Sequence, residues 1–292
     1  MFTARRTCLA VAPFFLIACG EDDDLPQGVE PTPYVLSARA MVGTETLDCQ
    51  GSYAGVGSNQ ATVALRDFKV YLSNIRLVDA AGVEYPFGLD DDGEWQNSRV
   101  GLFDFEDGTG TCVNGDADTN DVLTGSALTD EVAGLRFDIG VPFDLNHLDV
   151  ATAAAPLDRA GMYWVWANGY KFLRLDFSSD QPTANTSYNV HLGSRGCASV
   201  GPIAPTEACA QPNVASVELM GFDPREDVLT FDLAGLLAKV DTSTQTAGTA
   251  AGCQSGTAEA MECTPVFEGL GLSFADGVCA NDCAGQTFVG FQ

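Results

Sequence analysis

Positive charge, histidine and long hydrophobic runs are all scarce in this sequence. Its 292 residues include 14 Lys and Arg against 40 Asp and Glu, which gives a formal net charge of −26. A surface of this sign repels nucleic-acid phosphates and anionic lipid headgroups, which argues against a nucleic-acid-binding function. No run is apolar and long enough to form a transmembrane helix, and the Gly-x-Ser-x-Gly motif of many hydrolases is missing.

The N-terminal segment has the pattern of an export signal. Arg5 and Arg6 precede a short apolar run that ends in Leu16-Ile17-Ala18-Cys19, a sequence of the bacterial lipobox type. This pattern predicts cleavage after residue 18 and a lipid on Cys19. An ordinary secretory signal followed by a chance cysteine is the alternative.

The residues that follow predict how the mature chain is attached. Residues 19–33 are acidic and then proline-rich, which is typical of a flexible tether. We therefore expect a protein of the bacterial cell envelope, held at the membrane only by its lipid. It would face the periplasm or lie exposed on the cell surface.

Cysteine usage indicates an oxidising compartment. Apart from Cys8 and Cys19, eight cysteines remain, and an even number in an exported chain predicts a disulfide framework. About a hundred pairings of eight cysteines exist. Zinc ligation is the competing use, but no Cys-x-x-Cys pair is present. Local closure favours these bridges: Cys197–Cys209, Cys253–Cys263 and Cys279–Cys283, with Cys49–Cys112 left as the fourth.

Short apolar stretches with frequent glycine turns predict an all-β fold. We expect an antiparallel β-sandwich with long disulfide-tied loops and few short helices, built as a single domain over residues 34–292. A low-complexity loop rich in Thr, Ala, Gly and Ser is expected over 241–264. The predicted strands cover residues 35–42, 61–79, 135–139, 162–177, 188–192, 216–222, 228–233 and 287–291.

Aromatic residues and histidines gather around the stretch 162–176. Trp164 and Trp166 are two residues apart, so a strand would place them on one face, and Met162 would lie beside them. The only two histidines, His147 and His191, lie on either side of this stretch. Core packing of the aromatic residues, with two unrelated histidines, is the simpler interpretation.

Several long blocks of sequence occur in an order that resembles a known family. They are Asp-Phe-Lys-Val-Tyr-Leu-Ser-Asn-Ile-Arg-Leu (67–77), Leu-Phe-Asp-Phe-Glu-Asp-Gly-Thr-Gly-Thr-Cys (102–112), Gly-Val-Pro-Phe-Asp-Leu-Asn-His (140–147), Trp-x-Trp-x-x-Gly-Tyr-Lys-Phe (164–172) and His-Leu-Gly-Ser-Arg-Gly-Cys (191–197). Together they resemble the MbnP-like family, the copper-binding "metallo-mystery pair" proteins with a four-cysteine motif, over residues 35–235. The resemblance assigns Cys49, Cys112, Cys197 and Cys209 to that motif.

The resemblance implies an unusual copper site. In that family a di-haem partner of the MauG or cytochrome c peroxidase type, MbnH, converts the first Trp of the Trp-x-Trp motif to kynurenine. Here the modified residue would be Trp164, and Cu(I) would be held by His147, His191 and that kynurenine. An intact indole N–H only donates hydrogen bonds, whereas kynurenine offers an aniline nitrogen and a ketone. Trp166 would pack or relay electrons, and a thioether, Met162 or Met220, is the alternative third ligand.

We therefore expect an exported Cu(I)-binding lipoprotein in copper homeostasis or acquisition that is itself not an enzyme. The alternative is a structural or carbohydrate-binding β-sandwich that uses the tryptophan stripe as a platform. A secreted hydrolase is a third interpretation, but no residue pair is singled out for it. Calcium is the other candidate ion, because residues 116–121 begin like an EF-hand loop, but they lack its Gly and Glu. Solvated acidic loops are the favoured interpretation of that segment.

Overall fold

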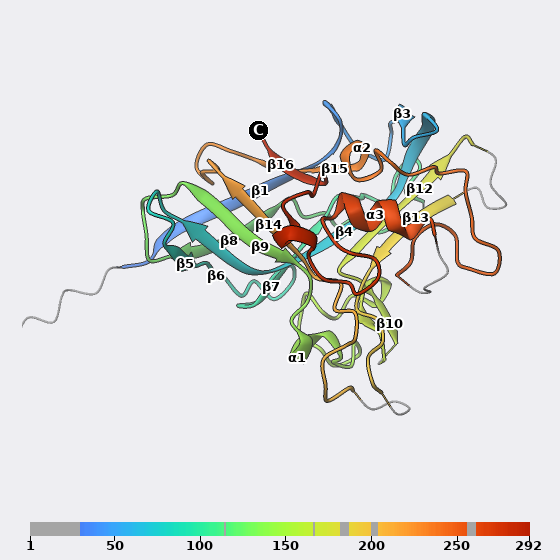
Figure 1. The fold of residues 1–292 in the computed structure, drawn as a ribbon. Helices are drawn as coiled ribbons and strands as arrows, with labels where there is room; N and C mark the ends of the chain where they lie inside the picture. The colour runs from blue at the N-terminus through green and yellow to red at the C-terminus, as the bar shows by residue number, and fades with distance from the viewer. Residues whose placement is uncertain (1–29, 114, 166, 182–186, 200–203, 256–260) are drawn as a thin grey trace, which may run out of the picture. The chain divides into compact units, whose positions relative to one another are not determined.

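The long strand β4 (Ala61–Val78) is the centre of the larger of two main sheets. The computed structural model describes residues 30–292 except 114, 166, 182–186, 200–203 and 256–260 (Figure 1). The larger sheet has the order β13-β12-β4-β9-β14, and β3, β5 and β7 also pair with β4. The bounds of these neighbours are β3 (Tyr53–Val56), β5 (Glu84–Pro86), β7 (Val100–Asp104), β9 (Gly134–Ile139), β12 (Leu173–Ser179), β13 (Ser187–Leu192) and β14 (Ala215–Met220).

The smaller main sheet has the order β16-β15-β1-β8-β6, with β2 paired to β1. Its β1 and β15 run parallel, although the strands of every other ladder seen in the described chain are antiparallel. Strands that are distant in sequence, β1 on one side and β15 and β16 on the other, therefore lie in one sheet. The bounds are β1 (Thr32–Val42), β2 (Glu45–Thr46), β6 (Gly88–Leu89), β8 (Val122–Ala127), β15 (Leu229–Asp232) and β16 (Val289–Phe291).

Phenylalanines join the two main sheets into a sandwich. The ring of Phe231, on β15, lies 6.3 Å from that of Phe68 on β4 and 5.9 Å from that of Phe103 on β7. All three side chains are fully buried, so they stabilise the fold through burial of apolar surface and through tilted ring contacts. The prediction of an all-β sandwich is confirmed.

Two bulges in β4 change which residues of the strand face the hydrophobic core. Leu65 pairs with Phe177 and Asp67 with Asp176, so Arg66 is an extra residue on β4. An extra residue reverses the alternation of faces, which allows Phe68 to continue the apolar face begun by Leu65. A second irregularity in the pairing of β4 with β9 includes Asn74, whose φ of 52° lies in the left-handed region that asparagine tolerates.

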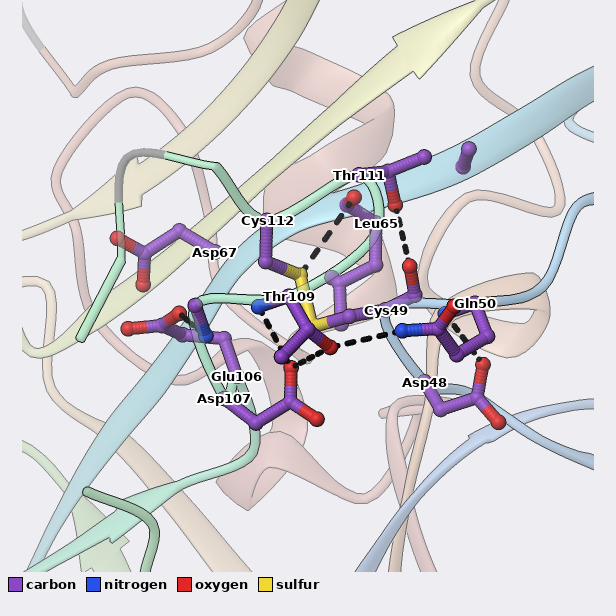
Figure 2. The surroundings of a disulfide bond; sticks show 12 residues. Asp48, Cys49, Gln50, Leu65, Asp67, Glu106, Asp107, Thr109, Thr111 and Cys112 are labelled. Carbon is purple, nitrogen blue, oxygen red and sulfur yellow. Dashed lines mark hydrogen bonds between the residues drawn. A yellow bond between two sulfur atoms is a disulfide. The ribbon is translucent and has the colours of Figure 1, made fainter. Parts of the chain in front are cut away.

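Four disulfides tie the loops, and their pairing is the one that local closure predicts. They are Cys49–Cys112, Cys197–Cys209, Cys253–Cys263 and Cys279–Cys283. Figure 2 shows the first, which fastens the loop after β7 to the loop after β2. The Thr111 hydroxyl donates to the Cys49 carbonyl, and the Gln50 amide donates to the Thr109 hydroxyl.

The helices are short, as expected, and lie between strands. They are α1 (Phe143–Asn146), α2 (Leu233–Leu236), α3 (Cys263–Gly269) and the 3₁₀ turns η1 (Ala160–Met162) and η2 (Ala280–Cys283). The sequence did not predict α3. It begins at the last residues of the expected low-complexity loop 241–264 and buries Val266 and Phe267. Part of that loop, 256–260, lies outside the described residues.

The predicted tether is two residues too long. Thr32 and Pro33 already pair with Ala127 and Ser126 of β8, so β1 begins inside the range 19–33. Pro33 is tolerated there because the parallel partner β15 pairs only from Ala38 onward, which leaves that edge of β1 without a ladder. The predicted signal peptide 1–18 and Cys19 lie outside the described residues.

Pro31–Gln292 forms one compact unit. Within the described part of the chain, no helix combines the length and the apolar character that crossing a membrane requires.

The expectation of one continuous strand over 162–177 is wrong. After η1 the chain forms a separate hairpin of β10 (Tyr163–Val165) and β11 (Gly169–Tyr170), and only then enters β12. Gly169 has a φ of +72°, and a Cβ there would lie 2.2 Å from the Asn146 carbonyl oxygen. This turn places Trp164 on the hairpin rather than in the main sheet, and Trp166 lies outside the described residues.

Candidate metal centre

His191 is held in place by a carboxylate. Its Nε2 lies 2.6 Å from Oδ1 of Asp176, and both residues are buried. Arg174 stands opposite His191 in the pairing of β12 with β13, and Asp176 is two residues further along β12. Burial raises the pKa of Asp176, but the hydrogen bond from His191 and the charge of Arg174 outweigh it and hold that pKa below its usual value.

The other ring nitrogen of His191 is left for a ligand. When Nε2–H of the neutral ring donates a hydrogen bond to Asp176, the lone pair of the imidazole is on Nδ1. Nδ1 is buried and has no hydrogen-bond partner in the described part of the chain. Metal-ligating histidines commonly donate their second nitrogen to a carboxylate, which fixes the tautomer and the ring orientation. With this geometry His191 could bind a metal through Nδ1.

Trp164 lies next to this imidazole. The two ring centroids are 6.4 Å apart, with the ring planes inclined by 53°. Trp164 also packs on the backbone of Gly193, where a Cβ would come within 2.5 Å of the indole Cζ3. Glycine at 193 therefore allows the indole of a β10 residue to lie beside the end of β13, where His191 is.

His147 follows the short helix α1 and is also buried. Its Nε2 lies 3.3 Å from Nδ2 of Asn146, and its ring meets the edge of Phe143 at 5.2 Å between centroids. The Asn146 amide also donates to the Ser194 hydroxyl at 3.3 Å. Ser194 directly follows the glycine on which Trp164 lies, so this bond connects His147 to the Trp164 side of the site.

The remaining predicted residues take different positions. Met162 is fully buried in the hydrophobic core, and Met220 is 53% exposed on β14. The Lys171 ammonium donates to the Gly161 carbonyl at 2.7 Å and lies 6.0 Å from the centre of the Trp164 ring. Burial lowers the pKa of Lys171 to about 8. These positions favour packing as the role of Met162.

The donor set suits a soft ion such as Cu(I), which imidazole nitrogens bind well. His147 and His191 could supply two such nitrogens, and His191 Nδ1 is a buried atom that lacks a partner in the described structure. Trp164 in its unmodified form adds no ligand, because its N–H only donates.

Sequence reasoning missed Asp176 and Asn146. Asp176 becomes visible as a partner only when the β12–β13 register is known. Asn146 is in the quoted block 140–147, but no pattern there signals its bonds across the site.

A second buried cluster contains its own cation. The Lys69 ammonium lies 3.4 Å from Asp67, 2.9 Å from Asp104 and 2.6 Å from Glu106. Oxygens of Asp104, Glu106 and Asp116 lie within 4.8 Å of one another, so the first residue of the calcium candidate joins this cluster. Burial raises the pKa of Asp104 to about 7 although Lys69 opposes the shift. Because the Lys69 ammonium already pairs with Asp67, Asp104 and Glu106, we assign the cluster to the fold rather than to a metal.

Comparison with known proteins identifies the family. The family model of MbnP matches residues 31–255. This chain belongs to the MbnP family. A solved structure of MbnP from Methylosinus trichosporium superposes with a TM-score of 0.78 and 28% sequence identity, covering 90% of this chain and 99% of that one. No curated protein matches the chain.

The MbnP match contains the centre described above and ends before the last three cysteines. His147, Trp164 and His191 all lie within residues 31–255, as do the four cysteines of the predicted family motif. Cys263, Cys279 and Cys283 follow the matched range. The family resemblance expected from the sequence blocks is confirmed.

Proposed function

We propose that this MbnP-family protein binds one Cu(I) ion in copper homeostasis or acquisition at the bacterial cell envelope. The observation that carries the proposal is His191, whose Nε2 is hydrogen-bonded to Asp176 while its buried Nδ1, beside Trp164, has no partner among the described residues. A buried polar atom without a partner destabilises a fold by about 1–3 kcal/mol, so a ligand that satisfies it explains why it persists.

Each residue of the centre has a distinct task. His191 supplies Nδ1. Asp176 fixes the orientation of the His191 ring and keeps a proton on its Nε2. His147 supplies the second imidazole, positioned by Asn146 and the edge of Phe143. Trp164 supplies the third donor only after oxidation to kynurenine, which opens the indole and exposes an aniline nitrogen and a ketone. Bound there, copper would be stored or handed on as a soft monovalent ion.

A di-haem oxidase of the MauG or cytochrome c peroxidase type would carry out that oxidation. In this proposal the chain is the substrate of its partner and not an enzyme itself. Trp164 is half-buried beside His191, so an oxidant would act on it at the protein surface. Lipid on Cys19 would hold the mature protein at the membrane, in keeping with the acidic and proline-rich segment that follows.

Co-expression tests this proposal. Expressed alone, the protein should retain an intact Trp164 and bind copper weakly. Expressed with its di-haem partner, it should show one carbon lost and one oxygen gained at residue 164 by peptide mass spectrometry, and it should retain Cu(I).

Trp164→Phe keeps most of the packing and should lose tight binding in the co-expressed protein. Val165→Ala is a matched control, because Val165 lies in the same strand and is exposed. Equal copper affinity of Trp164→Phe and the matured wild type would contradict the role of residue 164.

The alternative of a carbohydrate platform is less well supported. A platform needs tryptophans on an open face, whereas Trp164 packs on Gly193 with one side toward a buried histidine.

A further inference from the structure

The Cys197–Cys209 disulfide packs against the candidate copper ligand His147. The distance from Cys209 Sγ to His147 Nε2 is 3.7 Å. The three potential ligand atoms, one imidazole nitrogen and two sulfurs, all lie within 4.8 Å of one another. As long as the bridge is closed, neither sulfur can act as a thiolate.

The nitrogen that faces the bridge carries a lone pair. The backbone N–H of Tyr170 donates to Oδ1 of Asn146 at 2.8 Å, which fixes the orientation of that amide. The amide's Nδ2, which only donates, therefore points to His147 Nε2. Nε2 is then the acceptor nitrogen of the ring and is suited to metal ligation. One nitrogen that can ligate a metal and two sulfurs thus lie close together.

The bridge can be reached by a reductant. Cys197 is partly exposed, whereas both cysteines of Cys49–Cys112 and of Cys253–Cys263 are at most 2% exposed. Thiol–disulfide exchange needs access of a thiolate to one sulfur, so Cys197–Cys209 should open before these two buried bridges. Cys279–Cys283 also has one partly exposed cysteine. The chain has only two histidines, however, and both His147 and His191 belong to the candidate copper centre.

We propose that reduction of Cys197–Cys209 creates a second Cu(I) site, formed by His147, Cys197 and Cys209. An external dithiol gives two electrons and two protons to the bridge and becomes a disulfide itself. The two cysteine thiols then release their protons to solvent as the metal binds. Thiolates are the softest protein ligands and select Cu(I), and opening the bridge lets the sulfurs move apart around an ion.

This inference goes beyond the proposed function, because neither Trp164 nor His191 takes part. The two sites share His147, so reduction would withdraw that ligand from the kynurenine-dependent site. The state of one surface-accessible disulfide would then decide which ligand set holds the metal.

The test uses the full chain expressed without a partner and carrying Trp164→Phe and His191→Ala, so that the first site cannot contribute. The protein is treated with dithiothreitol, freed of it under anaerobic conditions, and mapped by thiol alkylation. Cu(I), supplied as its acetonitrile complex, is then titrated against a chromophoric Cu(I) chelator. Reduction should raise the affinity for one Cu(I) by at least about 100-fold.

Three variants make the result specific. Cys197→Ser/Cys209→Ser should abolish the gain, and Cys279→Ser/Cys283→Ser, which removes the other accessible bridge, should keep it. His147→Phe retains the bridge and should lose most of the gain, which covers the case in which the double serine variant fails to fold. Equal binding by the oxidised and reduced protein would overturn the proposal. So would a gain that survives loss of Cys197 and Cys209, or a bridge that stays closed while the fold is intact.

Discussion

Two buried polar clusters on the same sheet differ in how their polar groups are paired. Around Lys69, three carboxylates surround an ammonium that the chain supplies itself. Around His191, one carboxylate orients an imidazole whose other nitrogen is left without a partner in the described structure. Arg174 stands between them, at 2.8 Å from Asp67 and 2.9 Å from Asp176.

The difference separates a structural cluster from a ligand site. Lys69 provides a cation for its acidic neighbours, so that cluster already contains its own counter-ion, although Asp104 Oδ2 has no hydrogen-bond partner among the described residues. The His191 cluster has its orienting carboxylate but leaves Nδ1 without a partner among the described residues, an arrangement that a metal-ligating histidine would need. Three variants can break or sharpen this comparison.

The largest effect is expected for Lys69→Met. Methionine keeps the apolar stem but leaves the buried carboxylates without their cation, which should destabilise the protein by about 3–5 kcal/mol in urea unfolding. Lys239→Met is the control, because Lys239 pairs with Glu268 at the surface and should contribute less than about 1 kcal/mol. Similar losses in both variants would mean that the Lys69 cluster is not a stabilising unit.

The next effect concerns pH. Burial raises the pKa of Asp104 from 3.8 to about 7, so between these values the folded protein holds a proton that the unfolded chain has released. The stability from this group is therefore present at low pH and is lost as pH rises through that window, by at most about 4 kcal/mol. Asp104→Asn should remove this part of the decline in urea unfolding measured from pH 4.5 to 7.5.

Exposed Asp91→Asn provides the comparison for that pH series. It should reproduce the wild-type pH profile. An unchanged slope in Asp104→Asn would place the titrating group elsewhere.

The smallest of the three effects is expected for Asp176→Asn. The amide still accepts a hydrogen bond from His191 but without charge, so the imidazole is less firmly oriented and a weaker donor. Loss of such a second-layer carboxylate lowers metal affinity by about 10–100-fold. Competition of the matured protein with a Cu(I) chelator measures it. Asp180→Asn, which follows β12 and accepts from the Thr62 backbone, should leave copper affinity unchanged; a matching loss there would remove the special role of Asp176.

The sequence predicts the strands far better than it predicts the polar clusters. The β-rich composition of 61–79 and 188–192 is a local property, and β4 and β13 begin and end close to those bounds, although burial along β4 alternates only as far as Arg66. Local closure likewise identifies the disulfides, because three of the four bridges close short loops. The sequence does not reveal that the predicted strand 162–177 is interrupted near Gly169, because the interruption depends on the close approach of Asn146 from a distant segment.

The polar clusters depend on strand register. Lys69 meets Asp104 because they stand opposite each other on β4 and β7. Asp176 reaches His191 because β12 and β13 pair with Arg174 opposite the histidine. No sequence pattern predicts the register of β4 with β7 or of β12 with β13. The family resemblance pointed to His147, His191 and Trp164, but Asp176 required the folded sheet.

A crystal structure of the matured protein with Cu(I) bound tests the central claim most directly. We predict the ion on Nδ1 of His191, with Nε2 still bonded to Asp176 and with His147 and the oxidised residue 164 as the other ligands. Copper on Nε2 of His191 with Asp176 displaced, or copper bound among Asp104, Glu106 and Asp116, would contradict it.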